Sequence, residues 1–123
     1  MKEEYVRHIY YYKHYYLNFF QSLNAVVKKK FVWTLKLIAT IERVPTQYLK
    51  HLENTDSLFE IRVEVGSDIY RVFCFFDKDQ LVILINGFRK KSQKTPKREI
   101  ELTQKIKKNY FNEKERNKPF DLL

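Results

Sequence analysis

Cysteine, glycine and proline are scarce in this chain of 123 residues, which has one Cys, two Gly and three Pro. The lone Cys74 cannot form an internal disulfide, and its place within VFCFF predicts a small buried apolar side chain. So little Gly and Pro excludes a fibrous or low-complexity chain. Three scattered His and one Cys give no metal-ligand spacing, so we expect neither a metal nor another cofactor.

No hydrophobic run in the sequence reaches the roughly 18 residues of a membrane-spanning helix, which excludes such a helix. The first residues, MKEEYVRHIY, lack the charged and then apolar pattern of a secretory signal. Together with the lone cysteine, these absences predict a cytoplasmic protein that has no membrane partner.

Positive charge and aromatic side chains are what the sequence has in abundance. The net charge is +9, and the chain holds nine Tyr and ten Phe among 44% apolar residues. A small domain this basic usually binds an anionic partner, such as nucleic acid, a membrane surface or an acidic protein. The length suits one compact domain, which we assign to residues 1–112, followed by a polar tail at 113–123.

The hydrophobic pattern predicts the order strand, two helices, three strands, helix. Residues 58–65 alternate between apolar and charged side chains, which is typical of a strand with one buried face, whereas residues 81–88 are nearly all apolar. This order indicates an α+β fold: a small antiparallel-rich sheet of about four strands, two N-terminal helices packed on one face, and a C-terminal helix. The expected elements are strands at 6–12, 58–65, 69–76 and 81–88, helices at 16–23, at 25–44 and from Thr95–Pro96 onward, and a helical turn or irregular connection at 46–53.

Two hairpin turns decide which charged residues share a face of the sheet. A two-residue turn at Gly66–Ser67 places Arg62 opposite Arg71 on the next strand. A second such turn at Lys78–Asp79 places Arg71 opposite Asn86.

Glu60, Phe73 and Phe75 are expected on the same face as the two arginines. Cations interleaved with rings suit single-stranded nucleic acid, because cations bind phosphates and rings stack on bases. Two directly opposed arginines repel each other, so the pair indicates an anion between them or a carboxylate beside them. The alternative is that both arginines are merely solvated or paired with Glu60 and Glu64.

The densest positive charge lies where the apolar segment 81–88 gives way to the last predicted helix. Six of the ten residues from Arg89 to Arg98 are basic and none is acidic. We interpret this basic stretch as the mouth of a nucleic-acid-binding face, and the alternative is an ordinary soluble surface.

The order of these motifs resembles the RelE/ParE toxin superfamily, and within it the HigB-like toxins related to phage-derived proteins. That branch shows a Leu-aromatic-Glu-Leu-Arg strand, a Tyr-Arg-Val strand, an apolar strand ending in Gly-Phe, and Lys-Lys-x-x-x-Thr-Pro before the last helix. One departure is Asn86, where relatives often have a His, because Asn cannot exchange a proton near neutral pH. The matching segments are Leu58–Arg62, Tyr70–Val72, Gly87–Phe88 and Lys90–Pro96, and the similarity covers about residues 15–110.

The resemblance implies the toxin of a type II toxin–antitoxin system. Such toxins cut mRNA, usually in the decoding site of a translating ribosome. A cognate helix-turn-helix antitoxin, here HigA-like, neutralises them. The implied partners are therefore this antitoxin, the ribosome and mRNA.

RNA cleavage without a metal uses attack by the substrate's own 2′-hydroxyl, and it needs a proton acceptor, a proton donor and groups that stabilise the phosphoryl oxygens. We assign Arg62 and Arg71 to the scissile phosphate, because a guanidinium binds two oxygens at once. Glu60 is a candidate base, and Lys90 or Lys91 is the alternative base or the acid. The residues expected to bind flanking RNA are Lys94, Arg89, Lys97, Arg98 and Asn86.

Functions of other classes stay open at this point. Related ParE-like proteins bind DNA gyrase and cut no RNA, and a basic module that binds nucleic acid without catalysis is a further alternative. An inactive relic of a mobile element is another. If the arginines bind phosphate, changing either to alanine should relieve growth arrest and leave the fold intact.

Overall fold

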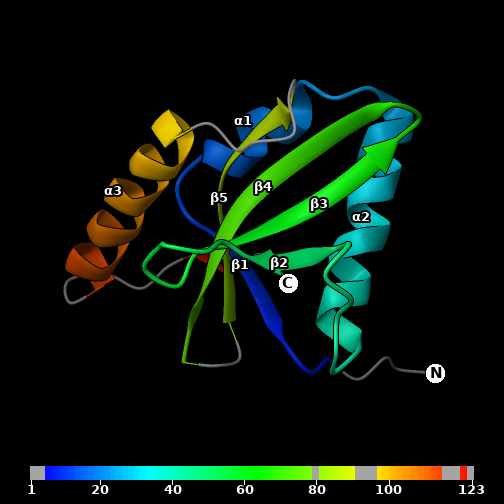
Figure 1. The fold of residues 1–123 in the computed structure, drawn as a ribbon. Coiled ribbons are helices and arrows are strands. Elements are labelled where there is room, and N and C mark those ends of the chain that lie inside the picture. Colours follow the sequence, from blue (N-terminus) through cyan, green and yellow to red (C-terminus); the bar gives the residue numbers. More distant parts are fainter. Residues whose placement is uncertain (1–4, 79–80, 91–96, 115–119, 122–123) are drawn as a thin grey trace.

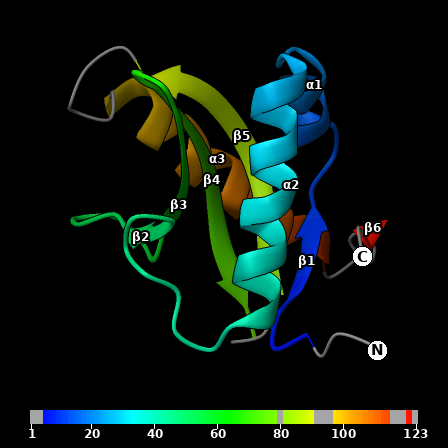
Figure 2. The ribbon, with the colours of Figure 1, turned by 90° about the vertical axis from the view of Figure 1, so that its right-hand side faces the viewer.

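The structure, a computed structural model, describes residues 5–78, 81–90, 97–114 and 120–121, and for 81–84, 90 and 120–121 it describes the backbone alone. The elements are β1 (His8–Tyr11), α1 (Tyr15–Gln21), α2 (Ala25–Thr40), β2 (Leu49–His51), β3 (Phe59–Val65), β4 (Asp68–Asp77), β5 (Leu81–Lys90), α3 (Lys97–Lys114) and β6 (Phe120–Asp121). One sheet has the strand order β2-β3-β4-β5-β1-β6. Helices α1 and α2 cover one face of this sheet and α3 covers the other (Figures 1 and 2).

The α+β class predicted from the sequence is confirmed. Strands β2 to β5 are antiparallel neighbours, and β1 lies parallel to β5 with His8 opposite Leu81. The segment 46–53, expected as a helical turn or an irregular connection, instead contains β2, whose Leu49 pairs with Ile61. Three residues within a polar stretch are too few for a periodic pattern, so the sequence does not predict this edge strand. Beyond β1, the short strand β6 pairs with it in antiparallel fashion.

Alternation along β3 and β4 sends side chains into two hydrophobic cores, one on each face of the sheet. Ile61 and Val72 pack in the first core with Phe31 of α2, and the lone cysteine is buried there as predicted. Phe75 packs in the second core with Tyr110 of α3, their ring centroids 5.2 Å apart. The sheet is thus a shared wall between the N-terminal helices and α3.

Arg7, in the segment before β1, terminates helix α2. Its guanidinium donates hydrogen bonds to the backbone carbonyl oxygens of Ile38, Ile41 and Glu42 at 3.0, 2.6 and 2.5 Å. Such carbonyls lack partners within the helix, and a cation at this end also complements the helix dipole. The helix therefore ends at Thr40, earlier than the sequence predicted.

Gly87 allows α1 to lie close against β5. A β-carbon built at Gly87 would lie 2.5 Å from Cδ2 of the Phe19 ring, well inside the optimal separation of nonbonded carbons. We expect Gly87→Ala to lower the free energy of unfolding by about 1–3 kcal/mol, measured by urea denaturation. Because the clash is with the ring, removing the ring should relieve it. The double variant Phe19→Leu/Gly87→Ala should therefore lose less unfolding free energy than the sum of the losses in the two single variants. Strict additivity of those losses would contradict the clash.

The β3–β4 hairpin has the predicted register. Gly66 takes a left-handed conformation with φ of +62° in the turn, and Val65 pairs with Asp68. Farther along the ladder, Arg62 pairs directly with Arg71. The two arginines therefore extend from the same face of the sheet, as the sequence predicted.

The β4–β5 register differs from the predicted one. Arg71 pairs with Phe88 instead of Asn86. The pairing starts with Asp77 opposite Leu81, one residue later on β5 than a turn at Lys78–Asp79 would give. A bulge between Val72 and Cys74 shifts the register by one more residue. Because the two shifts together amount to an even number, Asn86 keeps the face of Arg71 that the sequence predicted for it.

Helix α3 is anchored over β4 by hydrogen bonds to the carboxylate of Asp77. The hydroxyl of Tyr110 donates to Oδ2 at 2.6 Å, and Nζ of Lys114 donates to the same oxygen at 2.7 Å. Tyr110 is buried, and its ring packs in the second core. Burial alone would raise the pKa of Asp77, but the hydrogen bonds from Lys114 and Tyr110 outweigh burial and hold this pKa below its ordinary value.

We expect this anchor to weaken in acid. Because the folded-state pKa of Asp77 is lowered, its contribution to stability is complete above about pH 4 and is lost as the pH falls through the folded-state value. Tyr110→Phe should lower the free energy of unfolding by about 1–3 kcal/mol at pH 7, because a buried carboxylate loses a donor. In urea denaturation at decreasing pH, the gap between the variant and the wild type should narrow below about pH 4. A gap that does not change with pH would contradict this role for Asp77.

Candidate functional site

Arg62 of β3 and Arg71 of β4 form the centre of the candidate site, on the sheet face against which α3 packs. Their accessibility differs sharply, since the side chain of Arg62 is 24% exposed and that of Arg71 is 4% exposed. A ligand on this face would therefore meet Arg62 first and Arg71 beneath it. Figure 1 shows the two strands that carry them, side by side in the middle of the sheet.

Glu60 forms a buried salt bridge with Arg71. It lies two residues before Arg62 on β3, its side chain is 2% exposed, and its Oε1 accepts a hydrogen bond from Nη1 of Arg71. Burial lowers the pKa of Arg71, the Glu60 carboxylate opposes this effect, and the charge of Arg62 adds to the lowering. A guanidinium nevertheless stays protonated in proteins, so the pair is ionic. The sequence left pairing of the arginines with Glu60 and Glu64 as an alternative, and Arg71 does pair with Glu60.

Arg62 has a looser carboxylate neighbour. Its Nη2 lies 3.9 Å from Oε1 of Glu64, a residue that is largely exposed. Among the described residues, the Nε atoms of both Arg62 and Arg71 are buried without a hydrogen-bond partner. A buried donor without an acceptor costs free energy, so an anionic oxygen placed beside these two atoms would be stabilised.

Asn86 and the phenyl rings that share this face are covered by α3. Oδ1 of Asn86 accepts a hydrogen bond from Oγ1 of Thr103 at 2.8 Å, and its Nδ2 donates to Oε2 of Glu99 at 3.2 Å. Phe73 and Phe75 are fully buried in the second core. The expectation that these rings face RNA bases is therefore wrong, because α3 occupies the space above them. The amide of Asn86 docks this helix.

The described basic side chains near the end of β5 and at the start of α3 lie at the surface. Arg89 is 58% exposed and forms a salt bridge with Asp68 at the start of β4. Lys97 and Arg98 are exposed and open helix α3. These three cations are accessible to a large anionic partner, although Arg89 already has a carboxylate beside it.

The lysines expected to act as base or acid belong to the end of β5 and the residues after it. Lys90 is the last residue of the strand, and its backbone pairs with Ile69. Ile69 lies two residues before the arginine of β4, so the backbone of Lys90 is two positions from the arginine pair along the ladder. Lys91, Lys94 and the expected helix start Thr95–Pro96 lie outside the described residues.

The carboxylates beside the arginine pair, Glu60 and Glu64, form salt bridges with the arginines. Within the described ranges 5–78, 81–90, 97–114 and 120–121, no group of three or more His, Cys, Asp or Glu residues is arranged to hold a metal ion. In the same part of the chain, no helix is both long and apolar enough to cross a membrane.

Sequence reasoning missed the polar contacts between α3 and β5. Thr103 lies in the apolar stripe of α3 with Ile106 and Tyr110, and all three are buried. A polar residue in such a stripe signals a polar partner on the facing strand, and that partner is Asn86. The contact holds α3 against β5.

The α+β fold agrees with the resemblance to RelE-type proteins. The chain matches the family described as "Phage derived protein Gp49-like (DUF891)" over residues 18–108, and it belongs to that family. The Gp49-like family is related to the RelE toxins of toxin–antitoxin systems. The matched region contains the arginine pair, its buried glutamate and the first part of α3. A search of curated proteins finds no match to the chain.

Proposed function

We propose that this protein is the toxin of a type II toxin–antitoxin module and that it cleaves mRNA on the translating ribosome. The observation that carries the proposal is the direct opposition of Arg62 and Arg71, with two unpartnered Nε atoms, above a buried carboxylate. Membership of the Gp49-like family supports it. The net charge of +9 suits a partner as anionic as ribosomal RNA.

The proposed reaction uses the substrate's own 2′-hydroxyl. Its oxygen attacks the adjacent phosphorus, the bond from phosphorus to the 5′-oxygen of the next nucleotide breaks, and the products carry a 2′,3′-cyclic phosphate and a 5′-hydroxyl. The attacking hydroxyl loses a proton to a base, and an acid gives a proton to the leaving oxygen. The largest task for the protein is to stabilise negative charge that develops on the phosphoryl oxygens.

The burial pattern assigns different roles to the two arginines and the glutamate. Arg62 contacts the phosphoryl oxygens, because its side chain is the accessible one of the pair. Arg71 adds positive charge from beneath, and Glu60 acts as a positioning residue that holds it in place. Because Glu60 is bound to Arg71 and buried, we place the proton transfers on Lys90 or Lys91.

The remaining cations would hold RNA on either side of the cleaved bond. We propose this role for Arg89, Lys94, Lys97 and Arg98, which contribute affinity through phosphate contacts and carry no chemistry. Asn86 contributes indirectly, since it docks α3 beside the site.

Primer extension on abundant mRNAs after induction of the protein in bacteria tests the proposal. We expect new 5′ ends inside translated regions, and we expect these ends to disappear when the start codon of the reporter mRNA is removed. Arg62→Ala serves as the matched inactive control. Intact mRNA accompanied by DNA damage would contradict cleavage and would favour inhibition of gyrase.

We also propose a helix-turn-helix antitoxin as the neutralising partner. Its gene should lie beside that of the toxin, and the two proteins should copurify when they are expressed together. Growth arrest by the toxin that continues at full strength when the neighbouring gene is expressed would contradict this pairing.

A further inference from the structure

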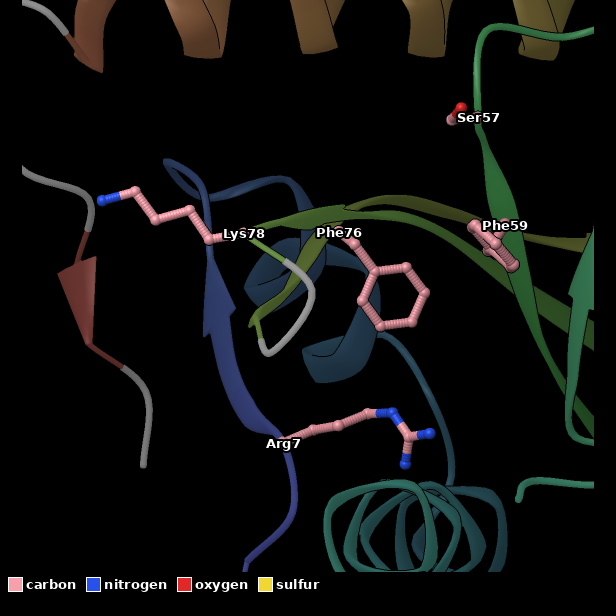
Figure 3. A pocket seen from close by; sticks show the side chains of 5 residues that line it. All are labelled: Arg7, Ser57, Phe59, Phe76 and Lys78. Atoms are coloured by element: carbon pink, nitrogen blue, oxygen red, sulfur yellow. The ribbon is translucent and has the colours of Figure 1, made fainter. Parts of the chain in front are cut away.

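A pocket lies on the sheet face opposite the arginine pair. Its volume is about 420 Å³, and it is lined by Arg7, Ser57, Phe59, Phe76 and Lys78 (Figure 3). Phe59 and Phe76 extend toward the N-terminal helices, whereas Arg62 and Arg71 extend toward α3. The proposed cleavage of RNA on the other face makes no use of this pocket.

Aromatic rings from two neighbouring strands, Phe59 of β3 and Phe76 of β4, form the wall of this pocket. The rings of Phe59 and Phe76 meet edge to face with centroids 5.0 Å apart, and His51 of β2 meets Phe59 in the same way at 5.1 Å. Phe59 and Phe76 are half-buried, and His51 is exposed. A row of accessible rings on adjacent strands is a surface on which a nucleobase stacks.

Two cations accompany these rings. The hydrogen bonds that Arg7 donates to the end of α2 use three of the five N–H groups of a guanidinium and fix its position. Figure 3 shows the Arg7 side chain extending past the ring of Phe76, and the Lys78 side chain directed away from the rings. Lys78 is exposed, so rotation about its flexible side chain can bring the ammonium group to the mouth of the pocket.

We propose that this pocket binds a nucleotide, with its base against Phe59 and Phe76 and its phosphate between Arg7 and Lys78. The pocket size falls within the range of small-molecule sites. The hydroxyl of Ser57 supplies a polar group at the rim for the sugar or the base edge. A free mononucleotide and one nucleotide of a single-stranded RNA have this same chemistry. The proposal does not rest on RNA cleavage, because every residue involved lies away from the arginine pair.

NMR spectroscopy of the 15N-labelled protein, titrated with AMP and separately with 2′-O-methyl hexaadenylate, tests the proposal. We expect saturable shifts of the backbone amides of Phe59, Phe76 and Lys78 with at least one of the two probes. Equal affinity for both probes identifies a mononucleotide site, and much tighter binding of the hexamer identifies a strand-binding site. If these amides stay unchanged with both probes at millimolar concentration, the proposal is wrong.

Two variants separate stacking from charge. Phe76→Leu keeps an apolar side chain but removes the ring, and it should weaken binding about ten-fold or more. Lys78→Gln changes an exposed residue, so the fold is retained, and it should weaken binding several-fold while making it less sensitive to salt. Phe111→Leu, at an exposed ring of α3, is the matched control and should bind as the wild type does. Wild-type affinity in both Phe76→Leu and Lys78→Gln would overturn the assignment.

Discussion

Changing Arg71 to methionine is expected to lower the free energy of unfolding by about 3–5 kcal/mol, because it leaves the buried carboxylate of Glu60 without its ionic partner. Methionine keeps a long, unbranched side chain that fills most of the space, so the loss reports mainly the charge. This expectation revises the one drawn from the sequence, in which the alanine variant keeps its fold intact. The revision follows from the burial of the pair, which the sequence does not reveal.

The double variant Glu60→Leu/Arg71→Met separates the stability of the pair from its function. Replacing both partners of a buried ion pair with apolar residues is often neutral or stabilising, so the double variant should recover most of the lost stability in urea denaturation. It should still fail to arrest growth, because Arg71 no longer places positive charge beneath the phosphate. If Arg71→Met alone lowers the free energy of unfolding by less than about 1 kcal/mol, the pair behaves like a solvated surface pair. That result would contradict a buried salt bridge.

The second large effect is expected at Arg62. Arg62→Ala should slow the cleavage of ribosome-bound mRNA by about 100- to 1,000-fold, the range seen when one group that stabilises a developing oxyanion is removed. The unfolding free energy should change little by comparison, since Arg62 is partly exposed and its carboxylate neighbour is 3.9 Å away. Single-turnover kinetics on programmed ribosomes measure the rate.

Two further variants serve as controls for Arg62. Arg62→Lys keeps the charge but loses the bidentate geometry, and it should recover only part of the rate. Arg89→Ala removes an exposed guanidinium near the end of β5, outside the arginine pair, and it should weaken binding without lowering the rate at saturation. If Arg62→Ala cleaves mRNA at the wild-type rate, Arg62 does not stabilise the phosphoryl oxygens and the proposed role is wrong.

Local patterns allowed much of the sheet to be predicted. The strict alternation of β3 and the glycine of its turn determine both the strand and the opposition of Arg62 and Arg71. The register of β5 was not predictable in this way, because a strand with apolar residues on both faces has no alternation that marks one of them. The bulge that places Phe88 opposite Arg71 therefore appears only in the structure.

The candidate site shows the same division between pattern and packing. Its charged residues could be named from the sequence, but their burial depends on where α3 lies. By covering Phe73 and Phe75, α3 removes the rings proposed for base stacking and turns Asn86 toward Thr103. The accessible rings beside Arg7 lie on the opposite face, where residues far apart in the chain meet. Contacts of this kind leave no local pattern in the sequence.

The most direct test of the phosphate site is NMR spectroscopy of the arginine Nε–H groups during titration with a 2′-O-methyl RNA that cannot be cleaved. We predict that the Nε–H signal of Arg62 shifts and saturates with the RNA, because the accessible part of the same guanidinium binds a phosphate oxygen. The shift should persist in Phe76→Leu, which alters only the pocket on the other face. An Arg62 signal that stays unchanged while the RNA saturates the protein would contradict the proposed phosphate site.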